Sequence, residues 1–144
     1  MGLKAQDIVP LSATGPTTLI PTSKDVVTKV FSVTRSDTSS TLKCVLPADA
    51  SILDMVKLGN TASDAATTAT VSIVVSDNTG AISTGTALDV KGAGATTAFV
   101  QMPSLPNITP LPLTGDLRIT ATYAETGAAS TTGGPWYIKV TYVR

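Results

Sequence analysis

Two short segments carry residue types that could perform acyl-transfer chemistry. Residues 40–43 read Ser-Thr-Leu-Lys and residues 76–78 read Ser-Asp-Asn, which match two of the three motifs of penicillin-binding enzymes. The third motif, Lys-Thr-Gly, is absent from the sequence. In those enzymes the Ser-x-x-Lys motif opens a helix, whereas residues 40–43 lead into a predicted strand, where residues three apart face opposite sides. We therefore interpret the match as chance.

The rest of the composition offers few groups for catalysis. The chain has no histidine and a single cysteine, Cys44, which excludes His-based catalytic pairs, His-based zinc sites and thiolate zinc clusters. The ten acidic residues are scattered, although a glycosidase could assemble two carboxylates from distant strands. Residues 80–85 have the glycine spacing of a phosphate-binding loop, but Thr86 stands where lysine is required. The sequence predicts no catalytic residue, no cofactor and no metal, and hence a protein that is not an enzyme.

The net charge and the hydropathy of the chain exclude nucleic acid and a membrane as partners. Ten basic and ten acidic residues give a formal net charge of zero, and charged residues make up only 14% of the chain. Because nucleic-acid binding needs a basic face to neutralise phosphates, we expect no nucleic-acid partner. No apolar run approaches the ~20 residues of a membrane span, so we expect no membrane partner. The first residues lack the apolar core of a signal peptide, which predicts synthesis in the cytoplasm without export by the usual route.

The pattern of residues along the chain indicates an all-β fold. Threonine is the commonest residue, and β-branched side chains favour strands, while 11 Gly and 9 Pro interrupt the chain too often for long helices. Short apolar alternations separated by turn residues are typical of a sandwich or barrel. We expect a single-domain, jelly-roll-like β-sandwich over residues 25–144, with an immunoglobulin-like sandwich as the alternative. The predicted strands are 26–34, 41–46, 51–58, 69–76, 81–90, 96–102, 117–124 and 135–143.

In two of the predicted strands the alternation of side chains needs closer inspection, because it decides which residues face the core. In the strand 41–46, alternation places Cys44 on an apolar face with Leu42 and Leu46, which predicts a buried thiol. In the strand 51–58, Ile52, Val56 and Leu58 share one side with Asp54, so this strand is either an edge or an imperfect alternation. A short helical turn over 48–54 is the alternative for that segment.

The last strand carries three of the six aromatic residues. Trp136 aligns with Ile138 and Val140, which predicts a core position. Tyr137 faces the opposite way and is a candidate for an exposed partner contact, such as one position of a sugar-binding platform.

Residues 1–24 are predicted to form an extended N-terminal arm. Prolines at three positions exclude a central strand there, because proline lacks the N–H that a sheet interior requires. The arm either covers its own domain or lies along a neighbouring subunit. Its candidate partner contacts are Ile8, Val9, Leu11, Leu19 and Ile20.

A second proline-rich passage covers residues 103–116. It contains four prolines with apolar residues between them, which predicts a rigid extended loop. The loop either packs over one end of the domain or contacts a partner. Its candidate contacts are Leu105, Ile108 and Leu111.

Three stretches of the chain resemble small capsid-associated proteins of tailed bacteriophages, the cement or decoration proteins. These stretches are 62–73 (ASDAATTATVSI), 117–123 (LRITATY) and 136–142 (WYIKVTY), and the likeness covers about residues 50–144. In such proteins, strands rich in Val, Thr and Ala are joined by Gly- and Ala-rich loops, and the chain often ends in an aromatic strand.

The resemblance implies a jelly-roll or related sandwich that binds the major capsid protein. Such a protein sits across junctions between capsid subunits as a dimer or trimer, and it reinforces the shell. The implied location is the exterior of the virion capsid, after assembly in the host cytoplasm. Two alternatives are a carbohydrate- or receptor-binding module of a head or tail fibre, and a small structural protein of the tail or connector.

Overall fold

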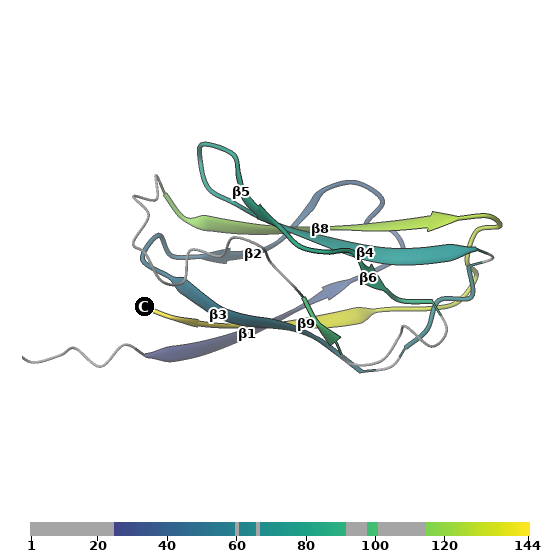
Figure 1. Cartoon of the computed structure of the whole chain (residues 1–144), viewed down its shortest axis with the longest axis horizontal. Helices are drawn as coiled ribbons and strands as arrows, with labels where there is room; N and C mark the ends of the chain where they lie inside the picture. The colour runs from purple at the N-terminus through teal and green to yellow at the C-terminus, as the bar shows by residue number, and fades with distance from the viewer. Residues whose placement is uncertain (1–24, 60, 66, 92–97, 101–114) are drawn as a thin grey trace, which may run out of the picture.

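The chain folds into two antiparallel β-sheets packed face to face. The structure, a computed structural model, describes residues 25–59, 61–65, 67–91, 98–100 and 115–144. One sheet has the strand order β1-β9-β3-β7, and the other has the order β2-β8-β4-β5, with β6 also paired to β4. Figure 1 shows the two sheets as separate layers. The strands are β1 Val26–Val33, β2 Thr41–Leu46, β3 Ser51–Leu58, β4 Thr68–Ser76, β5 Ala81–Thr84, β6 Leu88–Asp89, β7 Ala98–Phe99, β8 Leu117–Thr126 and β9 Trp136–Val143.

The all-β sandwich predicted from the sequence is thus confirmed. In the part of the chain that the structure describes there is no helix, and hence none that could cross a membrane. The helical turn considered for residues 48–54 is wrong, because β3 begins at Ser51. The single strand expected over 81–90 is instead two short strands, β5 and β6, which both pair with β4.

The strand pairing is nested. β1 pairs with β9, β2 with β8, β3 with β7, and β4 with β5, so the chain resembles one long hairpin wound into two layers. Consecutive strands from β1 to β4 alternate between the two sheets. Figure 1 shows the consequence, with the first strand lying beside the last.

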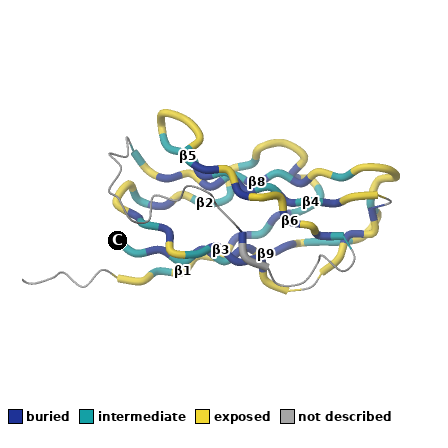
Figure 2. Tube along the Cα trace, viewed as in Figure 1, coloured by how far each residue is buried: buried dark blue, intermediate teal, exposed yellow. Residues whose placement is uncertain are grey.

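The core lies between the sheets and follows the alternation of the long strands. Every second residue of β4 and β9 is buried, and so is every second residue of β8 from Leu117 to Tyr123, as Figure 2 shows by the alternating colours along these strands. Trp136, Ile138, Val140 and Tyr142 of β9 all point inward, which confirms the core position predicted for Trp136. Burial of apolar area of this kind supplies the main driving force for folding, at about 25 cal/mol per Å².

Two β-bulges change the faces predicted for β2 and β3. The register of β2 shifts between Leu42 and Cys44, so Leu42 is 53% exposed while Leu46 stays buried. The expectation that Leu42, Cys44 and Leu46 share an apolar face is therefore wrong for Leu42. Cys44 is half-buried and packs against the core.

The bulge in β3 lies between Ile52 and Asp54. Ile52 points into the core, and after the bulge the inward positions belong to Met55 and Lys57. Asp54, Val56 and Leu58 share one side, as expected, but it is the outer side of the sheet, and Ile52 is not on it. A bulge has this effect because one extra residue inverts the alternation of everything that follows.

At one end of the sandwich the chain comes close to itself at a glycine. Gly133, in the loop between β8 and β9, has a φ of +123°, and a Cβ at this position would lie 2.7 Å from the Cα of Ser63. Side chains rarely tolerate either condition. Gly133 therefore allows the β8–β9 loop to lie against residues 61–65.

We predict that Gly133→Ala lowers the free energy of unfolding by about 2–3 kcal/mol, because backbone strain and a steric clash act together. Gly59→Ala is the matched control: its φ is +78° and no atom lies within 4 Å of the added Cβ, so only strain of about 1 kcal/mol applies. Urea denaturation of the two variants measures the difference. Equal losses in both would contradict the close approach at Ser63.

Candidate binding surface

The loops at one end of the sandwich are fixed by a polar network around Tyr123. The Tyr123 hydroxyl lies 3.0 Å from Ser63 Oγ and 3.1 Å from Ser130 Oγ, and it donates to Glu125 Oε2 at 2.5 Å. The Glu125 carboxylate also accepts the Ser130 N–H, and hydrogen bonds from the Ser130 and Tyr123 hydroxyls are the main causes that lower the pKa of Glu125. Arg35 donates to the Ser130 carbonyl. The network joins three separate loops.

A second set of contacts joins the same loops. Asp64 accepts hydrogen bonds from the Thr131 hydroxyl and from the N–H groups of Thr131 and Thr132, and these contacts lower its pKa to about 2. The Trp136 indole donates to the Thr61 carbonyl at 2.9 Å and stacks on Tyr123 with ring centroids 5.0 Å apart. Because these polar groups already have partners within the chain, this end acts as a rigid support.

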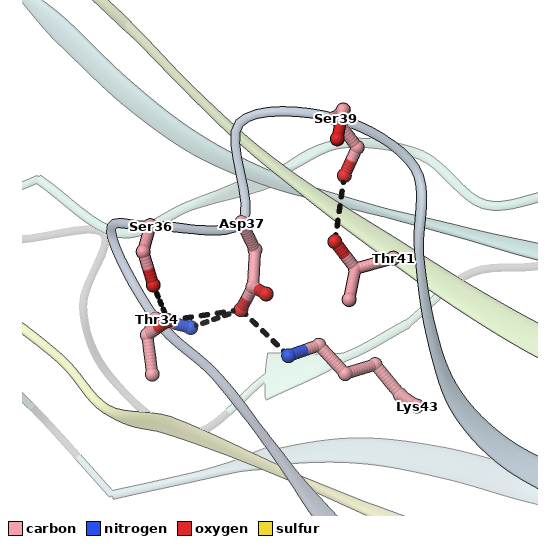
Figure 3. A network of polar contacts seen from close by, with 6 residues as sticks. All are labelled: Thr34, Ser36, Asp37, Ser39, Thr41 and Lys43. Atoms are coloured by element: carbon pink, nitrogen blue, oxygen red, sulfur yellow. Dashed lines mark hydrogen bonds and ion pairs between the residues drawn. The ribbon is translucent and has the colours of Figure 1, made fainter.

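The β1–β2 turn is closed by Asp37, as Figure 3 shows. Asp37 Oδ2 accepts from the Thr34 N–H and hydroxyl, and it forms an ion pair with Lys43 Nζ at 2.6 Å. Burial acts to raise the pKa of Asp37, but the hydrogen bonds from Lys43 and Thr34 outweigh it and the pKa is lowered. Lys43 of the Ser-x-x-Lys segment thus holds a turn, and this segment runs into strand β2, as the sequence analysis expected.

Lys57 is the unusual ionisable residue of the core. It points inward from β3, its side chain has no solvent exposure, and its Nζ donates to the Gly59 carbonyl at 3.3 Å. Burial lowers the pKa of Lys57, and the nearby Asp89 carboxylate opposes this effect. Because the core encloses this side chain completely, its amino group is closed to a substrate from solvent.

The described residues hold no group of three His, Cys, Asp or Glu side chains that could bind a metal ion. What the sandwich does present is an uneven distribution of exposed apolar residues. The exposed large apolar residues lie on β1, β2, β3 and β9: Val26, Val30, Leu42, Val45, Leu53, Leu58 and Tyr137. The outward positions of β4 and β8 are instead mostly threonine and serine, among them Thr70, Ser72, Thr120 and Thr122.

Part of this apolar surface forms a depression, which we call the edge cleft. It is open, has a volume of about 440 Å³, and is lined by Val30, Phe31, Ser32, Leu42, Lys43 and Tyr137. The cleft lies at β1 and β2, the terminal strands of their two sheets. Lys29 Nζ donates to the Val45 carbonyl at 2.9 Å, so these two strands lie side by side.

The edge cleft has a mixed lining, in which Val30, Leu42 and Tyr137 lie beside Ser32 and the ion-paired Lys43. Lys43 lines it, and Lys29 bridges the neighbouring strand. Burial raises the pKa of the Cys44 thiol, while Lys29 acts in the opposite direction, so the thiol keeps its proton at neutral pH and behaves as a small apolar group. The cleft therefore offers both apolar contact and polar groups to an occupant.

The structure places one of the sequence-predicted contact residues on this surface. Tyr137 is 49% exposed and lines the edge cleft. The other candidates, Ile8, Val9, Leu11, Leu19, Ile20, Leu105, Ile108 and Leu111, lie outside the described residues.

Five residues of the edge cleft were not among the predicted contacts: Val30, Phe31, Ser32, Leu42 and Lys43. Val30 could have been found, because it alternates with the inward-facing Phe31 in a β-branched run. Leu42 had no such signal, since the bulge that turns it outward leaves no mark in the alternation of residues 41–46.

Comparison with known proteins gives this chain no family. No protein-family model, no curated protein sequence and no solved structure matches it.

We predict that Lys57→Met raises the free energy of unfolding at pH 7 by about 1 kcal/mol, because a buried ammonium group is costly. Since the pKa of Lys57 is lowered from 10.5, the unfolded chain binds this proton more tightly than the native one, and the native protein gains stability as pH rises toward 10.5. The advantage of Lys57→Met should therefore shrink between pH 7 and pH 10 in urea denaturation.

Lys57→Arg is the control for this experiment, because an arginine stays charged at pH 10 and should retain its cost. A difference between wild type and Lys57→Met that is constant with pH would contradict the interpretation.

Proposed function

We propose that this chain is a structural virion protein, a cement or decoration protein that binds across junctions between major capsid proteins of a tailed bacteriophage. The observation that supports the proposal most is the edge cleft, where the exposed side chains of Val30, Leu42 and Tyr137 gather at the terminal strands β1 and β2. Strands β4 and β8, by contrast, present mostly small hydroxyl side chains on their outer face. A contiguous exposed apolar surface is typical of a protein-binding site. The resemblance of residues 50–144 to capsid-associated proteins points to the same class.

We infer further that the sandwich is a jelly roll. The nested pairing of β1 with β9, β2 with β8, β3 with β7 and β4 with β5 supports this, since it is the pattern of a rolled-up hairpin. Immunoglobulin constant domains keep their first two strands in one sheet, whereas β1 and β2 lie in different sheets here. Jelly rolls are used by many capsid and lectin domains.

The mechanism of reinforcement is thermodynamic. A protein that binds the assembled shell, and not the free subunits, stabilises the shell by mass action. Symmetry-related copies bound to one particle add avidity. The fixed loops around Tyr123 and Asp64 reduce the entropy lost on binding, because the bound shape already exists in the free protein.

The N-terminal segment belongs to the same proposal. Residues 1–24 lead directly into β1, which lines the edge cleft. A subunit held by the segment would therefore lie close to the cleft, and the two contacts would act together.

The two alternatives make different demands on the surface. A carbohydrate- or receptor-binding module would need an aromatic platform, and Tyr137 is the one aromatic among the exposed large apolar residues that the structure describes. A tail or connector protein would be present in few copies per particle, so copy number in purified virions separates it from a cement protein.

We predict that Leu42→Glu combined with Tyr137→Glu weakens capsid binding by about 30-fold, because two charges would be buried against an apolar contact. The measurement is co-sedimentation with particles of the encoding phage that lack the protein. The control, Thr70→Glu with Thr84→Glu, adds the same charge on β4 and β5, which are separated from β2 by β8, and should bind normally. Recovery of the wild-type protein only in free host cytosol would refute the capsid assignment.

Deletion of residues 2–24 should also reduce co-sedimentation, while the melting temperature of the sandwich stays within a few degrees of the full chain. The expectation rests on the apolar residues of the segment acting on the partner. Full capsid binding by the truncated chain would show that the segment is not a contact.

A further inference from the structure

The outer face of the five-stranded sheet carries a second depression, separate from the edge cleft. We call it the threonine pocket. It is open, and it lies at the start of β4, where this strand pairs with β6. Its volume of about 410 Å³ falls within the range of small-molecule sites, about 300–1,000 Å³. Its lining residues are Thr67, Thr68, Thr70, Asp89 and Lys91.

Contacts within the chain hold the two charged residues of the pocket in place. Asp89 Oδ1 accepts the Lys91 N–H at 2.8 Å, and Lys91 Nζ donates to the Thr67 carbonyl at 3.1 Å. Both side chains are thus ordered before a ligand arrives, which reduces the entropy lost on binding. In the part of the chain that the structure describes, the other carboxylate oxygen of Asp89, Oδ2, makes no hydrogen bond. Since Asp89 is exposed, a ligand can reach this oxygen.

The threonine hydroxyls of β4 add further acceptors. Thr70 Oγ1 donates its proton to the Ala124 carbonyl at 3.4 Å, so the lone pairs of this oxygen can accept a hydrogen bond from a ligand. Thr68 Oγ1 shares a hydrogen bond of 2.7 Å with Thr126 Oγ1, and a hydroxyl group can take part in more than one such bond. A ligand that matches these groups must therefore supply several hydrogen-bond donors.

The charges of the pocket decide which kind of donor fits. The Lys91 ammonium group disfavours a cationic ligand, and the Asp89 carboxylate disfavours an anionic one. We propose that the threonine pocket binds a neutral, hydroxyl-rich ligand, namely one sugar unit of a saccharide. Hydroxyl groups of the sugar donate to Asp89 Oδ2, in a charge-assisted hydrogen bond, and to Thr70 Oγ1. The threonine methyl groups supply the apolar surface on which the C–H groups of the sugar ring lie.

The binding is expected to be weak. None of the described lining residues is aromatic, so the sugar gains no stacking energy, and the site differs from an aromatic platform at Tyr137. We expect a dissociation constant of about 1 mM, which many copies acting together would strengthen by avidity. Strand β8 separates β4 from β2, so the threonine pocket and the edge cleft can be occupied at the same time. The sugar site is independent of the capsid proposal, because it requires no capsid protein.

Titration of the full chain with free sugars, followed by amide chemical shifts in NMR, tests the site directly. The probes are D-glucose, D-galactose, D-mannose and N-acetyl-D-glucosamine, each raised to about 100 mM, well above the expected dissociation constant. At least one of them should shift the amide signals of Thr70 and Asp89 along a saturable curve, while the signal of Tyr137 in the edge cleft stays in place. Inorganic phosphate and glycine serve as an anionic and a zwitterionic probe, and neither should shift the pocket signals.

Two substitutions assign the binding to the pocket. Asp89→Asn puts an amide donor beside the oxygen that accepts the Lys91 N–H, and Thr70→Val removes the hydroxyl but keeps a branched side chain. Each should weaken sugar binding by about 10-fold. Thr122→Val is the matched control, because Thr122 lies on the outer face of the neighbouring β8 and outside the pocket, so this variant should bind like wild type.

Three results would overturn the sugar site: no shift of the pocket signals with any of the four sugars, the same shifts with phosphate or glycine, or unchanged binding by Asp89→Asn. Circular dichroism checks that every variant is folded. Because the pocket lies away from the edge cleft, Asp89→Asn should co-sediment normally with capsids. Failure of the sugar site and failure of the capsid role are therefore distinguishable in the same set of proteins.

Discussion

Strand β9 is the element on which the rest of the sandwich depends. It is the last strand of the chain, yet it lies between β1 and β3 in the middle of its sheet. Its inward residues, Trp136, Ile138, Val140 and Tyr142, are all buried. The four-stranded sheet therefore cannot form until both ends of the chain meet, and long-range contacts of this kind make folding slow.

The position of β9 also divides the molecule into a fixed end and an open side. At the fixed end Trp136 stacks on Tyr123, and the surrounding loops satisfy one another's polar groups. On the open side β1 and β2 are terminal strands, and apolar residues remain exposed. The fixed loops hold the exposed surface of β1 and β2 in one shape. A surface that is already held in shape loses little entropy when a partner binds.

The sequence was sufficient for the architecture and for the face of the regular strands. The alternation in β9 correctly placed Trp136, Ile138 and Val140 in the core, since one face of the strand must be apolar. The alternation did not predict which residues of β2 and β3 face the core. A bulge shifts the register of a strand, and that register depends on pairing with strands that are distant in the sequence. Leu42, which lines the edge cleft, and Asp54, which lies on the outer face of its sheet, owe their positions to those bulges.

A physical reason for the bulge in β3 follows from its two possible registers. Without the bulge, inward-facing Ile52 would be followed inward by Asp54, in the middle of the strand and far from solvent. With the bulge, Met55 and Lys57 take the inward positions, so a buried lysine replaces a buried aspartate. The exchange is favourable because Lys57 lies near the strand end, where its long stem packs in the core and its Nζ reaches the Gly59 carbonyl. A short aspartate side chain has no such reach, so the bulge moves Asp54 to the outer face of the sheet.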